Sequence, residues 1–158
     1  MDYKLGIRNV TYQDLDEISE LDLMEDDLKE LQYAGFTNVP ITLITGCLMS
    51  MNQDQCVCRC YYELESGKIL GVYGITYVGT IWFLSSKELL NHYREFTKRT
   101  KEEFLGFTKG CGVVYNYVHS RHKRAIRWLK WLGFTIVGKP VYFTEPTELY
   151  FKMEYYGE

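Results

Sequence analysis

The sequence predicts a mixed domain of the α+β class, built around one mostly antiparallel sheet of about seven strands that is flanked by helices. Short runs alternate apolar and polar residues with a period of two, and longer runs repeat apolar residues at helical spacing. The predicted order is a strand, helices, three strands, a long helix, a strand, a helix and two strands. No linker or internal repeat divides the 158 residues, so residues 1–158 are expected to form a single domain.

The first third of the chain predicts one strand followed by three helical segments. Residues 4–10 alternate apolar and polar side chains, as a strand does. A Thr-x-x-Asp capping box at Thr11 starts a helical pattern that continues to Ala34, with a break near Asp22. Residues 38–53 predict another helix, which begins with Asn-x-Pro and ends at Asn-Gln.

The middle of the chain predicts three consecutive strands and a long helix. Residues 56–64 and 69–78 form a hairpin around a Gly-containing turn, and residues 80–84 add the third strand. The Ser-Ser-Lys-Glu sequence of residues 85–88 is a capping box. Residues 89–107 repeat large apolar side chains at helical spacing, so a long helix follows the third strand directly.

The last third predicts a strand, a helix and two more strands. Residues 113–118 read as a strand because they are rich in Val and Tyr. Residues 123–132 form a helix with one basic and one apolar face, and Gly133 ends it. The final two strands are expected at residues 134–137 and 149–155.

Charge is distributed unevenly along the chain. Residues 1–35 contain ten acidic and three basic residues, whereas residues 85–140 contain four acidic and twelve basic ones. The acidic part favours an amine-bearing substrate or a basic partner, and the basic part favours a phosphorylated ligand, although solvated helix faces give the same pattern. Trp128, Trp131 and Phe104 among the basic residues would suit single-stranded nucleic acid, but the net charge of −3 argues against nucleic acid as the partner.

The five cysteines predict reduced thiols. Their number is odd, and Cys56, Cys58 and Cys60 alternate along one predicted strand at about 7 Å, too far apart for one tetrahedral metal ion and poorly placed for mutual disulfides. No metal is therefore expected, and a Cys nucleophile has no local sequence support. The N-terminus has no apolar leader and no apolar run is long enough to span a membrane, so we expect a cytoplasmic protein without a membrane partner.

Residues 117–134 (YVHSRHKRAIRWLKWLGF) resemble the strand, helix and Leu-Gly-Phe turn of the GCN5-related N-acetyltransferases (GNATs). The Ala125-Ile126 pair, the turn at Gly133 and the spacing between them fit the family. The resemblance implies a GNAT-like acyl-CoA N-acyltransferase fold. It also implies transfer of an acetyl group from acetyl-CoA, as cosubstrate, to an amine on a small molecule or a protein.

A narrower resemblance joins three shorter stretches, at residues 30–35, 81–86 and 115–118, which are similar to the internal virion protein A family of bacteriophage T7. That family is a divergent branch of the acetyltransferase fold. The similarity implies a phage protein of the host cytoplasm or the virion, with a phage or host protein as partner. It leaves open a second function, that of a catalytically inactive virion or accessory protein that acts by protein contacts, including inhibition of a host factor.

The sequence departs from the GNAT pattern where the pyrophosphate of CoA is expected. The family's Gly-rich loop is replaced by WFLSSKELLNHYREFTKRTK at residues 82–101, so strand backbone, hydroxyls and direct positive charge are expected to bind CoA instead. The CoA-binding residues that the resemblance implies are Phe83, Leu84, Ser85, Arg94, Lys98, Arg99, His122 and Ala125. Replacing Lys98 and Arg99 by Ala is expected to weaken CoA binding.

The catalytic residues also differ from the family motif. The family's Tyr, four residues before Gly-Phe, is Leu129 here, and the family's Asn is His122. His122 titrates near neutral pH, which makes it the first catalytic candidate, and Tyr117 is the second. Further candidates for relaying a proton are Glu63, Tyr73, Tyr77 and Tyr115. We therefore expect an N-acetyltransferase of weak or specialised activity.

Overall fold

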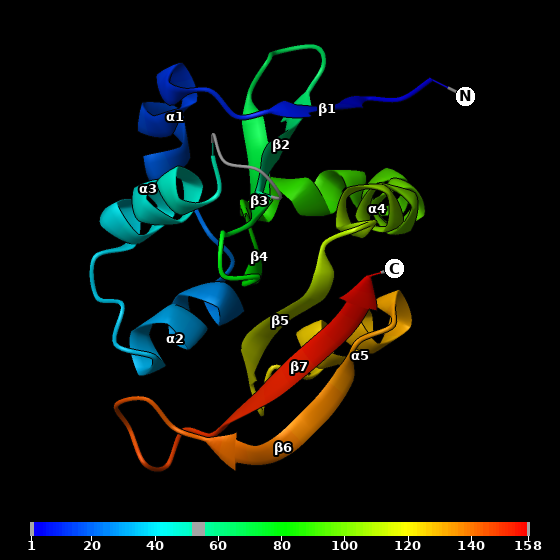
Figure 1. The fold of residues 1–158 in the computed structure, drawn as a ribbon. Coiled ribbons are helices and arrows are strands. Elements are labelled where there is room, and N and C mark those ends of the chain that lie inside the picture. The colour runs from blue at the N-terminus through cyan, green and yellow to red at the C-terminus, as the bar shows by residue number, and fades with distance from the viewer. Residues whose placement is uncertain (1, 52–55, 158) are drawn as a thin grey trace.

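The structure is a computed structural model that describes residues 2–51 and 56–157. Figure 1 shows the arrangement of the elements. In chain order they are β1 (Leu5–Asn9), η1 (Tyr12–Asp14), α1 (Leu15–Ser19), α2 (Glu25–Tyr33), α3 (Val39–Met49), β2 (Val57–Glu63), β3 (Ile69–Ile75), β4 (Ile81–Ser85), η2 (Lys87–His92), α4 (Tyr93–Thr108), β5 (Gly112–His119), α5 (Lys123–Leu132), β6 (Thr135–Val141) and β7 (Tyr150–Gly157).

The strands form two sheets that meet at β4 and β5. The first sheet has the order β1-β2-β3-β4 and the second the order β5-β7-β6, with antiparallel neighbours throughout. The predicted fold class is therefore confirmed. The predicted single sheet is divided, because β4 and β5 run parallel and are joined by a bridge between Thr80 and Tyr115 before they separate.

Helices cover the first sheet on both faces. Figure 1 shows α1, α2 and α3 on one side of β2 and β3, and α4 on the other. Ile18 of α1 and Leu43 of α3 are buried in one apolar cluster with the first sheet. Phe104 of α4 and Leu132 of α5 are buried in another with Met153 of the second sheet. The helices α4 and α5 thus meet over the place where the two sheets separate.

The break predicted near Asp22 has a structural role. The helical pattern is divided into η1, α1 and α2, and the segment between α1 and α2 crosses the end of β4. Leu23 forms an isolated bridge with Ser86, and the N–H of Met24 donates to the carbonyl of Ser85 at 3.2 Å. This crossing carries the first turn of α2 to the space between β4 and β5.

Two predicted helix boundaries differ in the structure. The capping box at residues 85–88 starts the 3-10 helix η2, in which the Ser86 hydroxyl accepts the N–H of Glu88 at 3.2 Å, and α4 begins only at Tyr93. The tighter 3-10 turn buries Leu89 beside the sheet before the α-helix starts. The helix predicted for residues 38–53 ends at Met49 as α3, and its predicted end at residues 52–53 lies outside the described residues.

The cysteines are all free thiols. Cys58 and Cys60 are buried in β2, and Cys56 is partly exposed just before that strand. Burial raises the pKa of Cys60 to about 12, which keeps it a protonated, apolar side chain at neutral pH. Among the described helices, none combines the length and the apolar character that crossing a membrane requires.

Candidate active site

The site begins where β4 and β5 separate. Beside the bridge, the N–H of Tyr115 donates to the carbonyl of Gly79 at 3.0 Å. One step further, the side chain of Asn116 takes the place of a backbone pair. Its Nδ2 donates to the carbonyl of Ile81, and its Oδ1 accepts the N–H of Tyr117 at 2.6 Å. Asn116 therefore holds the two strands at the start of the gap.

The strand β4 turns the backbone of alternate residues toward this gap. In an antiparallel pair the N–H and C=O of alternate residues point to the partner strand. The N–H of Ser86 donates to the carbonyl of Leu70, in register with the pairing of β3 and β4, so the even-numbered residues of β4 pair with β3. The backbone groups of Ile81, Phe83 and Ser85 consequently face β5.

Phe83 presents the free backbone groups in this row. The carbonyl of Ile81 accepts from Asn116, the carbonyl of Ser85 accepts from Met24, and the N–H of Ser85 interacts with the Asp27 carboxyl. The N–H and C=O of Phe83 form no hydrogen bond across the gap with any described residue. A ligand between the strands thus meets one donor and one acceptor at Phe83.

Leu84 cannot share this role. It is an even-numbered residue of β4 and pairs with Val72, so its N–H points to β3 and away from the gap. Of the two neighbouring residues expected to offer backbone groups, Phe83 faces the gap and Leu84 faces β3. The period of two along a strand decides between the neighbouring residues.

A groove of about 550 Å³ leads to the gap between η2, the start of α4 and α5. We call it the outer groove, and Arg124, Arg127, Trp128 and Thr97 line it. The indole N–H of Trp128 and the hydroxyl of Thr97 are buried and have no hydrogen-bond partner among the described residues. Because buried polar groups are normally paired, these two atoms mark places where a polar ligand fits.

A smaller space of about 160 Å³ lies deeper, between β4, β5 and the facing sides of α4 and α5. We call it the inner cavity. It shares part of its wall with the outer groove, namely the residues Asp27, Phe83, His122, Ala125 and Trp128. The two spaces therefore meet where the backbone of β4 is open.

Three titratable side chains gather at this shared wall. Asp27 and Glu30 come from α2 and His122 precedes α5, and each offers a ligand atom within 4.8 Å of the others. His122 Nδ1 lies 3.2 Å from Glu30 Oε1, which also accepts the N–H of His119 at 2.8 Å. Two carboxylates and an imidazole at this spacing are suited to proton transfer, and they could also hold a divalent cation.

The surroundings shift the pKa values of these groups. Burial, helped by the charge of Glu30, raises the pKa of Asp27 to about 7. Burial by itself lowers the pKa of His122, but the contact with Glu30 and the charges of Asp27 and Asp26 outweigh it and raise that pKa above its ordinary value. Near neutral pH, Asp27 can accept a proton while the neighbouring imidazole can donate one.

Several residues predicted from the sequence come together here. Phe83, His122 and Ala125 border both the inner cavity and the outer groove, Ser85 borders the outer groove, and Tyr117 borders the inner cavity. Two structural reasons account for this. The strand β4 runs along the gap, and α5 starts at its mouth.

The predicted cations of α4 lie elsewhere. Arg94, Lys98 and Arg99 line neither space, because the aromatic face of α4 turns to the groove and its charged face turns away. The Arg99 guanidinium donates to the carbonyl of Leu5 at 2.6 Å and to Glu95 Oε2 at 3.0 Å. Arg99 therefore ties α4 to β1 and lines neither the outer groove nor the inner cavity.

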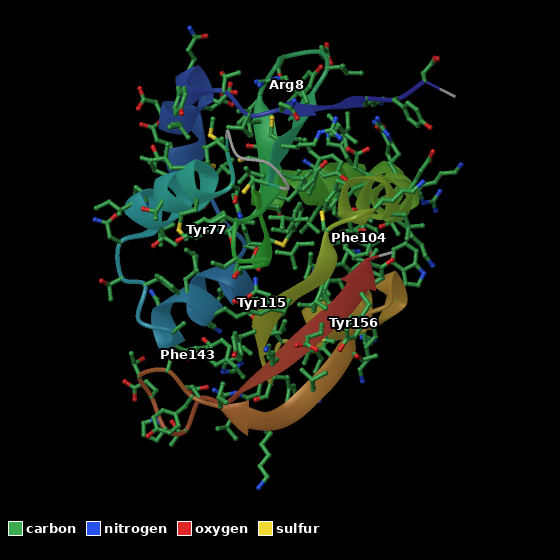
Figure 2. The ribbon with its side chains drawn as sticks, viewed as in Figure 1. Arg8, Tyr77, Phe104, Tyr115, Phe143 and Tyr156 are labelled. Atoms are coloured by element: carbon green, nitrogen blue, oxygen red, sulfur yellow. The ribbon has the colours of Figure 1, made fainter. Side chains whose placement is uncertain are left out.

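Most of the proposed proton relays are also engaged away from the cluster. Glu63 lies 3.3 Å from His92 Nε2. Tyr73 borders the inner cavity, but its hydroxyl donates to Glu103 Oε1 at 3.0 Å and burial raises its pKa. Tyr77, labelled in Figure 2, is exposed on the turn between β3 and β4.

Sequence reasoning missed Asp27, Glu30, Asn116, Arg124 and Arg127. Asp27 and Glu30 are three residues apart on α2, and the two arginines are three apart on α5, so each pair lies on one helix face. That spacing is common on solvated helices. Only the packing of α2 and α5 across the gap shows which face meets the site.

Known proteins resemble this chain in structure rather than in sequence. No family model matches the chain, and no curated protein matches it in sequence. A GNAT-family acetyltransferase from Streptococcus pneumoniae has a TM-score of 0.68 at 17% identity, over 98% of this chain and 99% of that one. The chain has the GNAT fold.

Two further structures with the GNAT fold were solved with CoA. The spermidine N-acetyltransferase from Vibrio cholerae, in complex with CoA and spermine, has a TM-score of 0.69 at 13% identity over 97% of this chain and 95% of that one. The PaiA N-acetyltransferase from Thermoplasma acidophilum, in complex with CoA, has a TM-score of 0.64 at 14% identity over 98% and 99%. The GNAT-like fold implied by residues 117–134 is confirmed.

Proposed function

We propose that the protein is an N-acyltransferase that transfers an acetyl-type group from a CoA thioester to an amine. One observation carries the proposal: the free backbone N–H and C=O of Phe83 lie in a gap between two parallel strands, beside the half-buried cluster of Asp27, Glu30 and His122. A carbonyl of the thioester at the Phe83 N–H would be polarised by it. The cluster supplies the proton transfers.

The outer groove fits the CoA portion of that substrate. Arg124 and Arg127 offer positive charge to its phosphates, in place of the missing Gly-rich loop. The unpaired Trp128 N–H and Thr97 hydroxyl suit the amides of the pantetheine arm. The half-exposed ring of Trp131 at the rim offers a stacking surface for the adenine.

The α2 side of the gap, opposite the basic residues of α5, fits a cationic acceptor. Asp26, Asp27 and Glu30 of α2 surround His122 there, so an ammonium group on a small molecule or a protein would be attracted. The structurally similar spermidine N-acetyltransferase, solved with spermine, and a ribosomal-protein-S18-alanine N-acetyltransferase from Escherichia coli represent both kinds of amine.

The reaction balances with these residues alone. The Asp27 carboxylate takes one proton from the ammonium group, and the nitrogen lone pair attacks the thioester carbon while the Phe83 N–H holds the developing oxyanion. The C–N bond forms and the C–S bond breaks. His122 gives its proton to the departing thiolate, and the second proton of the nitrogen restores the imidazolium.

Calorimetric titration with CoA and acetyl-CoA at moderate salt tests the proposal. We expect micromolar binding, followed by release of the CoA thiol when spermine or a Lys-containing peptide is added. The variant Arg94→Ala serves as control, because Arg94 lines neither space, and its binding should match that of the wild type. Absence of binding at millimolar CoA would refute the proposed activity.

A second candidate is a phage virion or accessory protein that keeps the fold without the reaction, in the virion or the host cytoplasm. An exposed apolar surface on the loop between β6 and β7 favours it: Tyr142, Phe143 and Leu149 are all exposed there, and Figure 2 labels Phe143. Two results together would support this function instead. The wild-type protein would bind no CoA, and the Phe143→Ser variant would lose binding to a phage or host protein that the wild type binds.

A further inference from the structure

The inner cavity continues past the point where acyl transfer would occur. The thioester would enter from the outer groove and meet the Phe83 N–H at the shared wall. Beyond Phe83 the inner cavity extends between β4 and β5 toward α4, where Phe104, Phe107 and Met153 line it. Figure 2 shows Phe104 where α4 faces the second sheet. The acyl chain attached to the thioester carbonyl would therefore project into this space.

The deep end of the inner cavity is apolar. Leu129, Leu132 and Phe134 complete its wall there. Two hydroxyl groups that border this end are already paired inside the protein. The Tyr61 hydroxyl donates to the Thr100 hydroxyl at 3.3 Å, and the Tyr73 hydroxyl donates to Glu103. Water would find few partners in such a space, whereas hydrocarbon would fit.

The inner cavity is too large for an acetyl group. Its volume of about 160 Å³ is close to that of an apolar cavity of about 150 Å³, engineered in another protein, which binds benzene. An acetyl group carries a single methyl beyond its carbonyl and would leave most of the space empty. Some of the volume is needed for the thioester itself, which leaves room for a short chain.

We propose that the acyl donor carries a short apolar acyl chain of about four carbons, such as a butyryl group, in preference to acetyl. This inference rests on the proposed function and narrows its substrate class. Each buried methylene is expected to tighten binding about fourfold. The preference would end where the chain reaches the ring of Phe104 at the far wall.

The test compares the dissociation constants of CoA, acetyl-CoA, butyryl-CoA and hexanoyl-CoA for the full chain. We expect butyryl-CoA to bind about tenfold or more tightly than acetyl-CoA. Affinities for all three acyl-CoAs within twofold of one another would overturn this inference and leave the proposed function standing. No binding of CoA itself would overturn the proposed function, and this inference with it.

Variants that change the cavity make the test specific. Leu129→Phe and Ile81→Phe fill the space from opposite walls and should abolish the preference for butyryl-CoA while acetyl-CoA still binds. Leu105→Phe is the matched control, since Leu105 is exposed on α4 outside the cavity. Phe107→Leu enlarges the space and should move the preference toward hexanoyl-CoA. An unchanged preference in folded Leu129→Phe and Phe107→Leu proteins, with folding checked by thermal unfolding, would contradict the assignment.

Discussion

The two sides of the gap between β4 and β5 differ in charge and in the kind of side chain they present. The α2 side carries the carboxylates of Asp27 and Glu30, whereas the α5 side carries Arg124, Arg127 and buried indole surface. The acidic first part and the basic later part of the sequence meet at this one opening. This difference supports the proposal that an amine and the phosphates of CoA reach the gap from opposite sides.

The largest effect is expected when the Asp27 carboxylate is removed from the acidic α2 side. Asp27→Asn should lower the rate of acyl transfer by about 10²–10³-fold, because the proton acceptor is lost. It should also stabilise the fold at alkaline pH. The pKa of Asp27 rises from 3.8 to about 7 on folding, so ionised Asp27 destabilises the native state progressively from pH 4 to 7 and fully above pH 7. Thermal unfolding should show a gain at pH 8 of up to about 4 kcal/mol and none at pH 3.

Glu25→Gln is the control for this variant. Glu25 has the same charge on the same helix, but its side chain is 78% exposed and lies 3.3 Å from Lys29 Nζ. It should leave both the reaction rate and the pH dependence of stability close to those of the wild type. Equal effects of the two substitutions would show that bulk charge, rather than the half-buried cluster, governs the acidic side.

The next largest effect is expected when positive charge is removed from the basic α5 side. Replacing Arg124 and Arg127 together by Ala should weaken CoA binding about tenfold or more, because two cations that face its phosphates are removed. Calorimetry with CoA measures the change, and dephospho-CoA should lose less if one arginine contacts the 3′-phosphate. Folding should be unaffected, since both residues are exposed. A CoA affinity equal to that of Arg94→Ala would contradict the placement of the phosphates.

A smaller effect is expected at Asn116, which joins β4 and β5 at the start of the gap. Asn116→Ala removes the side-chain bridge between β4 and β5, which should lower the free energy of unfolding by about 1–3 kcal/mol by leaving two backbone groups unpaired. Urea denaturation measures this loss. Asn91→Ala, at an exposed position of η2, should cost much less. If the two variants are equally stable, Asn116 does not hold the strands.

The smallest effect sharpens the contrast between the cations of α4 and those of α5. Arg99→Ala should cost about 1 kcal/mol of stability, because its partly exposed guanidinium bonds the carbonyl of Leu5 and the Glu95 carboxylate. Its CoA affinity should equal that of the wild type. A marked loss of CoA binding in Arg99→Ala, with the fold intact, would restore the role that the sequence resemblance implied.

The sequence was most reliable where local geometry decides the structure. The helix of residues 123–132 has the predicted ends, because Gly133 adopts a φ of +111°, a left-handed conformation that terminates a helix. The box of Thr11 and Asp14 forms as predicted. The predicted candidate His122 lies at the site because it immediately precedes α5, which starts at the mouth of the gap. The α-helix predicted to follow the capping box begins only at Tyr93, because the 3-10 helix η2, in which Leu89 is buried, comes first.

Most elements, their order and the separation of charge along the chain could be predicted from local sequence patterns, since periodicity, caps and composition act over a few residues. Which charges share a site depends instead on how the helices pack across the gap. The Arg99 guanidinium bonds the carbonyl of Leu5, whereas Arg127 lines the outer groove, although both are arginines on basic helix faces. Asp27 gained a pKa near 7 because α2 was carried across the end of β4 and buried there. Such pairings join residues far apart in the chain, and only the packing of the whole chain determines them.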